Sequence, residues 1–451
     1  MKQNDLTRGS VPGMLFRFAV PLLAANILQS LYGAVDLFVV GQYCSAQSVA
    51  AVSTGTQVTQ IVTSLITGLT LGGTILVGKY MGRRDYEKVK QTIGTTLTVF
   101  AGTAILLTVL MLAFLRPLLR ALDTPEEAFS LTAQYVTICS LGNFFICGYN
   151  AISAILRGYG DSTRPMAFVG IACVINIALD FVFVKFFRMD VSGTALATVI
   201  SQAVSMGISV VYLKKKDFLF DFRLPSFRPV GEIIRELAGV GIPISFQELA
   251  VRISFLYLTA VMNRCGVYAA AVVGISSKYD VFAMLSATSM ASALAAVTAQ
   301  NVGAGKPERA RKALWYGLGF ALAVSFVFWG WAQISPRSMI GAFTSDAGVI
   351  EAGIPFFRSC SYDYLMVALV FCLNGYLNGR EKTLWTMVSC TAGALVFRIP
   401  LVWYFSSHFA DDLGMLGRIA PTVSGIMACY TLFYVLYEGR KTKSGLRKRP
   451  A

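Results

Sequence analysis

The feature that most constrains this chain is a series of apolar runs long enough to cross a lipid bilayer. A hydrocarbon core about 30 Å thick needs roughly 20 helical residues per crossing. Twelve runs of this length occur, at 14–40, 47–78, 92–115, 129–156, 165–187, 191–213, 237–263, 267–300, 313–334, 350–378, 384–407 and 413–437. Because backbone groups in lipid must satisfy one another, each run is predicted to be a helix. The sequence therefore predicts an all-α integral membrane protein with twelve transmembrane helices.

The composition excludes several other classes of protein. Of the 451 residues, 55% are hydrophobic and only 14% are charged, whereas a soluble domain has about 25% charged residues. A single His and nine Cys without a C-x-x-C pair argue against a zinc site, a thioredoxin-type centre or a disulfide framework. The net charge of +15 does not indicate a nucleic-acid partner, because the basic residues lie in loops between the apolar runs.

The positions of Lys and Arg predict the orientation in the membrane. When successive loops are assigned to alternate sides, 28 of the 39 Lys and Arg residues fall on one side and seven on the other. The remaining four lie within spans: Arg252, Lys278, Arg358 and Arg398. By the positive-inside rule, both termini are predicted to be cytoplasmic in a multi-pass protein of the cell membrane.

The two halves of the chain repeat each other. Pro21 in FAVPLLAAN aligns with Pro243 in VGIPISFQE at an offset of 222, and residues 77–91 align with 298–312 at an offset of 221. Since each half has an even number of crossings, the repeats have the same orientation and are related by a pseudo-twofold axis along the membrane normal. The predicted organisation is an N-lobe over 1–213, a cytoplasmic linker over 214–236, a six-helix C-lobe over 237–437 and a basic cytoplasmic tail over 438–451.

Two acidic residues in the first six spans have no basic partner at their depth. A charge in the bilayer centre costs about 2.5–3.5 kcal/mol, so Asp36 and Asp180 need either a proton or a metal cation. A helical rise of 1.5 Å per residue puts Asp36 about 6 Å and Asp180 about 10 Å from the outer ends of their spans. Asn176 lies one turn from Asp180, and Thr198 and Tyr135 lie about 10 Å deep. The alternative is that both carboxyl groups are hydrogen-bonded packing groups or contact interfacial water.

The last six spans carry a more balanced set of charges. Glu248, Asp280 and Asp363 are accompanied by the four basic residues within spans. Glu248 and Arg252 lie one helical turn apart, so a structural ion pair explains them equally well. We expect Arg398 to neutralise a neighbouring carboxylate rather than to bind substrate.

Pro21 lies inside the first span. A proline in a helix removes one backbone hydrogen bond and bends the helix, and neighbouring groups can satisfy the freed carbonyl. Both a conformational hinge and a static kink are consistent with its position.

Together these features resemble the multidrug and toxic compound extrusion (MATE) family. The resemblance covers nearly the whole chain and rests on the duplicated twelve-span layout and on FAVPLL with an Asp fifteen residues after the proline. It also rests on VGKYMGRRD, AQNVGAGKPERA and, before span 5, RGYGDSTRPM at 157–166.

The resemblance implies a secondary active exporter that moves organic, often cationic, compounds in antiport with H⁺ or Na⁺ by alternating access. The resemblance also implies which residues couple transport to the cation. The positions that match the family's cation-coupling residues are Asp36, Asn176, Asp180, Thr198 and Tyr135, and Asp36 and Asp180 would be metal ligands if the ion is Na⁺. A second acidic site is implied at Glu248 and Asp363. The charge balance favours the N-lobe as the location of the coupling site. The expected partners are a lipophilic organic cation and the lipid bilayer, and the protein is expected to be a monomer.

Two other functions are weaker alternatives. A lipid-linked oligosaccharide flippase of the same superfamily would have more basic residues along its central cavity, and such proteins commonly have additional membrane spans. A membrane-embedded enzyme needs an Asp-rich metal motif or a His-based acid/base pair, and the lone His408 falls in a predicted outer loop. We therefore expect no catalytic residues and no cofactor beyond the transported H⁺ or Na⁺.

Overall fold

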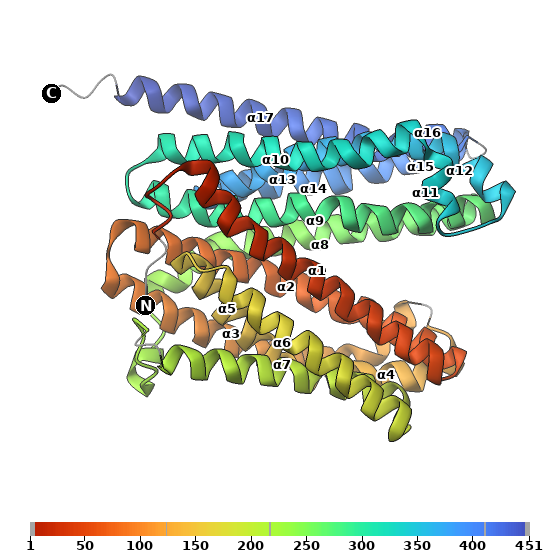
Figure 1. The fold of residues 1–451 in the computed structure, drawn as a ribbon, viewed down its shortest axis with the longest axis horizontal. Helices are drawn as coiled ribbons and strands as arrows, with labels where there is room; N and C mark the ends of the chain where they lie inside the picture. Colours follow the sequence, from red (N-terminus) through yellow and green to blue (C-terminus); the bar gives the residue numbers. More distant parts are fainter. Residues whose placement is uncertain (1–4, 123, 216–217, 410–411, 447–451) are drawn as a thin grey trace. The chain divides into compact units, whose positions relative to one another are not determined.

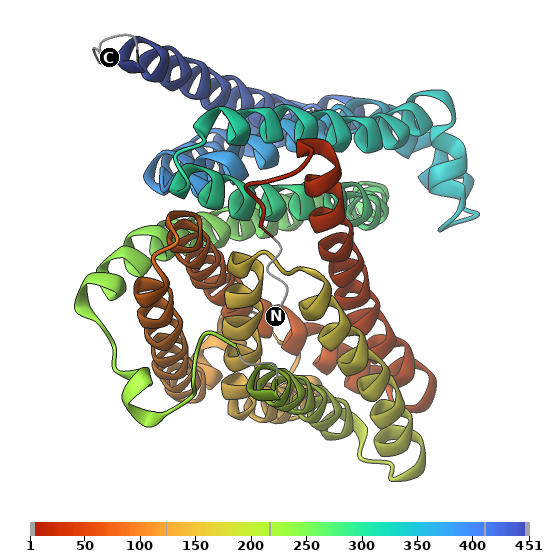
Figure 2. The same cartoon turned by 60° about the vertical axis from the view of Figure 1, so that its left-hand side comes forward.

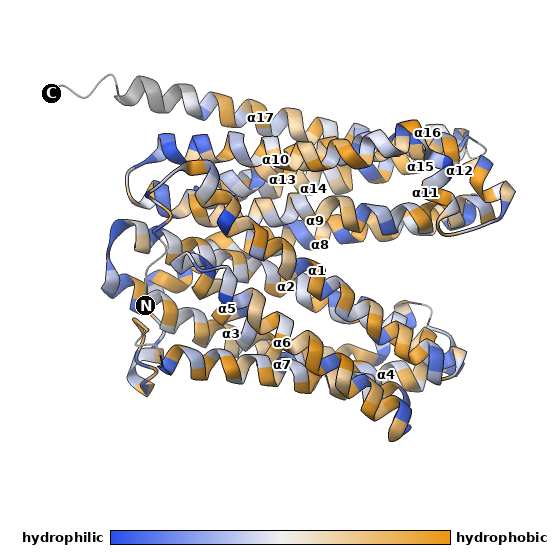
Figure 3. Ribbon diagram, viewed as in Figure 1, coloured by the Kyte–Doolittle hydropathy of each residue, from blue (hydrophilic) through white to orange (hydrophobic). Residues whose placement is uncertain are grey.

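The computed structural model describes residues 5–122, 124–215, 218–409 and 412–446, and these residues are helical with short connections (Figure 1). Among the described residues, eleven helices are long and apolar enough to cross a membrane, and a bent pair of helices, counted as one span, makes a twelfth. Apolar residues dominate along the helices, and hydrophilic ones gather toward their ends (Figure 3). The all-α, twelve-helix prediction is confirmed. Residues 216–217 of the predicted linker and 447–451 of the basic tail lie outside the described residues.

The first six crossings are built from eight helical elements. They are α1 (Val11–Tyr43), α2 (Ala46–Arg83), α3 (Tyr86–Ala121), α4 (Glu126–Leu141), α5 (Asn143–Tyr159), α6 (Thr163–Asp180), the π-helix η1 (Phe181–Phe186) and α7 (Asp190–Lys215). A 3₁₀ turn, η2 (Leu224–Phe227), lies between the two halves.

The last six crossings follow the same plan with more interruptions. They are formed by α8 (Gly231–Arg264), α9 (Val267–Gly303), α10 (Pro307–Ile334), α11 (Pro336–Gly341), α12 (Ala347–Cys360), α13 (Tyr362–Gly379), α14 (Thr383–Thr391), the π-helix η3 (Ala392–Arg398), α15 (Ile399–His408), α16 (Leu413–Gly417) and α17 (Ile419–Leu446).

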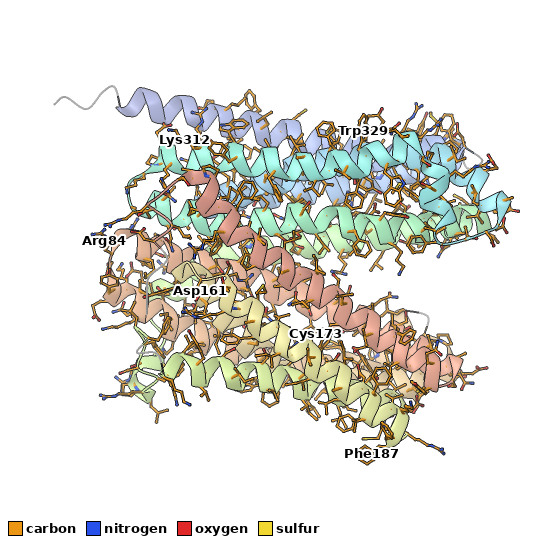
Figure 4. The ribbon with its side chains drawn as sticks, in the orientation of Figure 1. Arg84, Asp161, Cys173, Phe187, Lys312 and Trp329 are labelled. Atoms are coloured by element: carbon orange, nitrogen blue, oxygen red, sulfur yellow. The ribbon has the colours of Figure 1, made fainter. Side chains whose placement is uncertain are left out.

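These elements form two compact units. The first consists mainly of Arg17–Ser245 together with the short piece Ala299–Gly305, and the second mainly of Phe246–Thr298 and the chain from Lys306 onward. Within the first unit, α2 packs on α3, α4 and α5, and α7 packs on α4, α5 and α6. Within the second, α13 packs on both α10 and α17. Figure 4 shows Arg84 and Phe187 at opposite ends of the first unit.

The fourth crossing differs from the continuous span that was expected over 129–156. Two helices, α4 and α5, meet there at an angle of 47°. Gly142 separates them, and a Cβ atom at this position would lie 2.4 Å from the Cγ2 atom of Val199 on α7. The break therefore coincides with a close approach that only glycine permits.

Two crossings contain a π-helical segment, which is the last part of the crossing in the first unit and lies in the middle of the crossing in the second. In the first unit η1 begins directly after Asp180, and in the second η3 ends at Arg398. Single turns of π-helix inside α-helices frequently occur at functional sites. The apolar pattern of the sequence contained no signal for either turn.

The polar segment between the halves is folded onto the first unit. Thr98 on α3 donates a hydrogen bond to the backbone oxygen of Phe227 at 2.6 Å, and Figure 2 shows this light-green loop beside the brown α3. The Ser226 hydroxyl donates to Asp221 Oδ1 at 2.6 Å, which lowers the pKa of Asp221. Residues 214–215 belong to α7, and residues 231–236 belong to α8.

The end of α9 packs unusually closely on α2 within the first unit. A Cβ atom at Gly303 would lie 2.2 Å from the backbone oxygen of Lys79. We expect Gly303→Ala to lower the apparent Tm of the purified protein by several degrees, because the helix backbones must separate to admit the methyl group. Gly274→Ala, in the same helix with no neighbouring atom within 4 Å, is the control and should match or exceed the wild type. Equal melting of both variants would contradict this view of the packing.

Candidate functional site

Four of the five residues proposed for cation coupling meet inside the first unit. Asp36 comes from α1, Asn176 and Asp180 from α6 and Thr198 from α7. Asp180 and Asn176 are fully buried, and Asp36 is 5% exposed. The carboxyl groups of Asp36 and Asp180 are close enough to interact directly, with the Asn176 amide beside them. The Thr198 hydroxyl donates a hydrogen bond to Asp36 Oδ2 at 3.4 Å.

Tyr135, the fifth residue, lies at the margin of this group. Its ring packs on α2 at Gly55, where a Cβ atom would lie 2.4 Å from the Tyr135 Cδ1 atom. Its hydroxyl interacts with the Thr56 side chain and is within electrostatic range of Cys139 and Asp36. Tyr135 is therefore a neighbour of the carboxylates, and its main contacts are with α2.

The polar atoms of the site are buried and incompletely satisfied. In the part of the chain that the structure describes, Asp36 Oδ1, both Asp180 oxygens and both polar atoms of the Asn176 amide have no hydrogen-bond partner. Among the described residues, the interactions of the two carboxyl groups involve each other, the amide and the hydroxyl, and no Lys or Arg. Buried polar atoms are normally paired because leaving one unpaired costs about 1–3 kcal/mol, and more for a charged group.

This arrangement can hold a proton or a hard metal cation. A proton on one carboxyl group would let it donate to the other, whereas a cation such as Na⁺ would be bound by carboxylate, amide and hydroxyl oxygens. Within the described residues, no group of three or more His, Cys, Asp and Glu side chains is placed to hold a metal. Binding of Na⁺ would therefore depend on the neutral oxygens of Asn176 and Thr198 as well as on the two carboxylates.

Sequence reasoning missed two members of the site. The hydroxyls of Tyr32 on α1 and Ser201 on α7 lie 2.9 Å apart, and the Tyr32 hydroxyl also donates to the backbone oxygen of Thr198 at 3.3 Å. Tyr32 is within electrostatic range of both Asp36 and Asp180. Its position one turn before Asp36, on the same helix face, was the available signal.

The acidic residues of the second unit have separate surroundings. Glu248 on α8 is half-buried and interacts with Arg252 one turn away. Asp363 on α13 is 6% exposed and lies within electrostatic range of Asp280 and of Arg398. The interactions of Glu248 and Asp363 thus involve different partners, and each set includes an Arg side chain.

Arg398 is anchored by uncharged groups. One of its terminal nitrogens donates to the Ser254 hydroxyl at 3.0 Å, and its guanidinium carbon lies 4.2 Å from the centre of the Phe255 ring. Its interaction with Asp363 is electrostatic. The expectation that Arg398 neutralises a carboxylate stays a prediction.

Pro21 lies within α1, which continues as one helix from Val11 to Tyr43. It precedes Asp36 in the same helix. Its role as a hinge stays a prediction.

Comparison with known proteins agrees with this architecture. The model of the family described as MatE matches the chain twice, over residues 21–182 and 243–404. The chain is 26% identical over 417 residues to the probable multidrug resistance protein YpnP of Bacillus subtilis, covering 92% of each protein. It is 23% identical over 405 residues to the multidrug export protein MepA of Staphylococcus aureus, covering 88% of this chain and 87% of that protein.

A solved structure has the same fold. It is described as the outward-facing conformation of a multidrug resistance MATE family transporter of the MOP superfamily. The TM-score is 0.91 at 23% sequence identity, with 100% of this chain and 99% of the other covered. The two-lobe fold is therefore shared over the full length.

Proposed function

The chain belongs to the MatE family, and on that premise we propose that it exports organic, often cationic, compounds in antiport with H⁺ or Na⁺ by alternating access. The observation that carries this proposal is the pair Asp36 and Asp180, buried side by side with unpartnered oxygens. Two neighbouring carboxylates without a counter-charge bind a mobile cation strongly. A gradient of that cation can therefore supply the energy for export.

In the proposed cycle, the cation enters from outside and binds between α1, α6 and α7. Its binding changes the local packing of these helices, near the α to π transition that follows Asp180, and lowers the affinity for substrate. Pro21 is the proposed hinge in α1, because it removes a backbone hydrogen bond on the same helix. Tyr32 and Thr198 would transmit the change between α1 and α7 through their hydrogen bonds.

The remaining features of the proposal follow from charge. A lipophilic organic cation is the proposed substrate class, since it would compete electrostatically with the coupling ion. We further propose a monomer in the plasma membrane with both termini cytoplasmic, supported by the distribution of basic residues. Oligosaccharide flipping is less favoured, because among the described residues the interactions of Asp36 and Asp180 involve no Lys or Arg that would bind a lipid phosphate.

The proposal is tested by transport into inverted membrane vesicles. A fluorescent lipophilic cation is added outside, and outward-directed gradients of Na⁺ and of H⁺ from the vesicle lumen are imposed separately. We expect uptake to follow one or both gradients and to collapse when that gradient is dissipated by an ionophore. Uptake that proceeds equally without either gradient would contradict antiport, and vesicles lacking the protein give the background.

A further inference from the structure

One end of the second unit, where α10 begins and α13 and α17 end, carries an excess of positive charge. Nine Lys and Arg residues and three Glu residues lie in the segments 306–312, 380–382 and 438–443. Arg380 Nη1 lies 2.7 Å and Lys382 Nζ 3.8 Å from carboxylate oxygens of Glu438 on α17. On α10, Arg311 Nη1 lies 3.3 Å from the position that a Cβ atom at Gly439 would take. Basic side chains from two other segments therefore meet beside one carboxylate of α17.

This arrangement differs from that of the repeat-related segment in the first unit. There the Lys79 ammonium lies 3.2 Å from the Glu236 carboxylate. The Lys88 ammonium lies 3.0 Å from the Glu232 carboxylate, so each of these cations has a carboxylate of its own. In the second unit, two cations share one carboxylate and a third cation lies beside them. These four side chains carry a net charge of +2, which an anion from outside the chain can offset.

An aromatic face adjoins the charged cluster. The ring centre of Trp385 on α14 lies 4.2 Å from that of Tyr434 and 5.2 Å from that of Tyr430, both on α17. The Tyr434 hydroxyl donates to Glu438 Oε1 at 3.3 Å, which joins the aromatic stack to the cluster. Trp385 is 37% and Phe433 73% exposed. Because Trp and Tyr side chains are enriched at the level of the lipid headgroups, we place the cluster at that level.

The cations of the cluster differ in how firmly they are held. Arg380 donates to the Tyr376 hydroxyl at 3.4 Å, and its guanidinium carbon lies 5.6 Å from the centre of that ring. Lys382 has 46% of its side chain exposed, and Lys312 is exposed at the same end of α10 (Figure 4). Guanidinium and ammonium groups are strong donors to phosphate oxygens. A rigid base with accessible cations around it therefore suits a phosphate group.

We propose that this cluster binds the phosphate of an anionic phospholipid of the phosphatidylglycerol type. Arg311 and Lys382 donate to the phosphate, and the exposed face beside Trp385 contacts the acyl chains. A soluble anion would make no use of this apolar face, which favours a lipid as the occupant.

The positive-inside rule accounts for Lys and Arg in these loops, but it does not account for their convergence on one shared carboxylate. Basic pockets between the ends of transmembrane helices commonly bind anionic headgroups. The site goes beyond the proposed function, because it concerns the surrounding lipid and not the exported compound.

The test measures the quenching of tryptophan fluorescence by lipids with brominated acyl chains, in purified full-length protein in detergent micelles. Brominated phosphatidylglycerol should half-quench the wild type at a mole fraction on the order of tenfold lower than brominated phosphatidylcholine. Added salt should weaken this preference, because it screens the attraction between charges. Trp385→Phe should reduce the part of the quenching that is specific to phosphatidylglycerol. The control is Trp403→Phe, an exposed position on α15, which should leave that part unchanged.

The charges are tested by Arg311→Gln combined with Lys382→Gln, which keeps the contact between Arg380 and Glu438. This variant should lose most of the preference for phosphatidylglycerol. Its matched control is R228Q/R235Q, which removes two exposed cations from the first unit and should keep the preference. The apparent Tm of both variants in phosphatidylcholine shows whether they are folded, and Lys382→Gln alone carries the test if the double variant is unstable.

Three results would overturn the lipid site. They are equal quenching of the wild type by both lipids, an unchanged preference in R311Q/K382Q or, if that variant is unstable, in Lys382→Gln, and an equal loss of preference in R228Q/R235Q. The last result would mean that net charge attracts the lipid without a defined site. These measurements involve no transport, so their failure leaves the antiport proposal standing.

Discussion

Asp36→Asn is expected to abolish gradient-driven export while the protein stays folded. The substitution keeps the size of the side chain and its contact with Thr198. It removes one of two buried charges whose interactions, within the described part of the chain, involve no Lys or Arg. Without that charge, the site no longer needs a mobile cation, and the gradient loses its coupling to substrate release. We expect the initial rate of vesicle uptake to fall on the order of tenfold or more.

The control for this substitution is Glu87→Gln. Glu87 is an exposed carboxylate that pairs with Lys90 at the start of α3. Such surface pairs contribute little, so export by this variant should equal that of the wild type. Correct insertion of Asp36→Asn is shown by its membrane level and its apparent Tm. If this correctly inserted variant retains full gradient-driven uptake, Asp36 is not part of the coupling site.

The transmembrane architecture could be predicted because each crossing follows from the length of an apolar run. The break at Gly142 could not be predicted, since it depends on the approach of Val199 from a helix distant in the sequence. The π-helical turns after Asp180 and before Ile399 could not be predicted from the sequence either, because they preserve the apolar composition of the span.

The centre of the candidate site was predictable for an energetic reason. A carboxyl group within a span is costly, which singled out Asp36 and Asp180, and helix periodicity added Asn176. Tyr32 was not predicted as a site residue, because an aromatic side chain is common in a membrane helix. Its hydrogen bond to Ser201 depends on how α1 and α7 pack together. The position of Tyr135 over Gly55 was equally a matter of packing.

Charge balance in the second unit was only partly predictable. The presence of acids and bases could be counted, but their pairing could not. Arg398 is anchored by Ser254 and Phe255 and interacts electrostatically with Asp363. That arrangement became apparent only when the helices were placed in three dimensions.

The second large effect concerns the exchange of substrate for cation in the purified protein. If cation binding weakens substrate binding, then substrate must weaken cation binding by the same factor. Adding the fluorescent cation to cation-loaded protein should therefore release the ion that completes Asp36 and Asp180. The double variant D36N/D180N has no buried charge at this site and should bind the fluorescent compound without releasing an ion from it.

The most direct measurement is to count the ions released per molecule of bound substrate. A pH-indicator dye in weakly buffered detergent solution reports H⁺, and a sodium electrode reports Na⁺. We predict release by the wild type and by Glu87→Gln, with that release reduced by about one ion or more in D36N/D180N. If the double variant releases as many ions as the wild type, the buried pair does not hold the coupling cation.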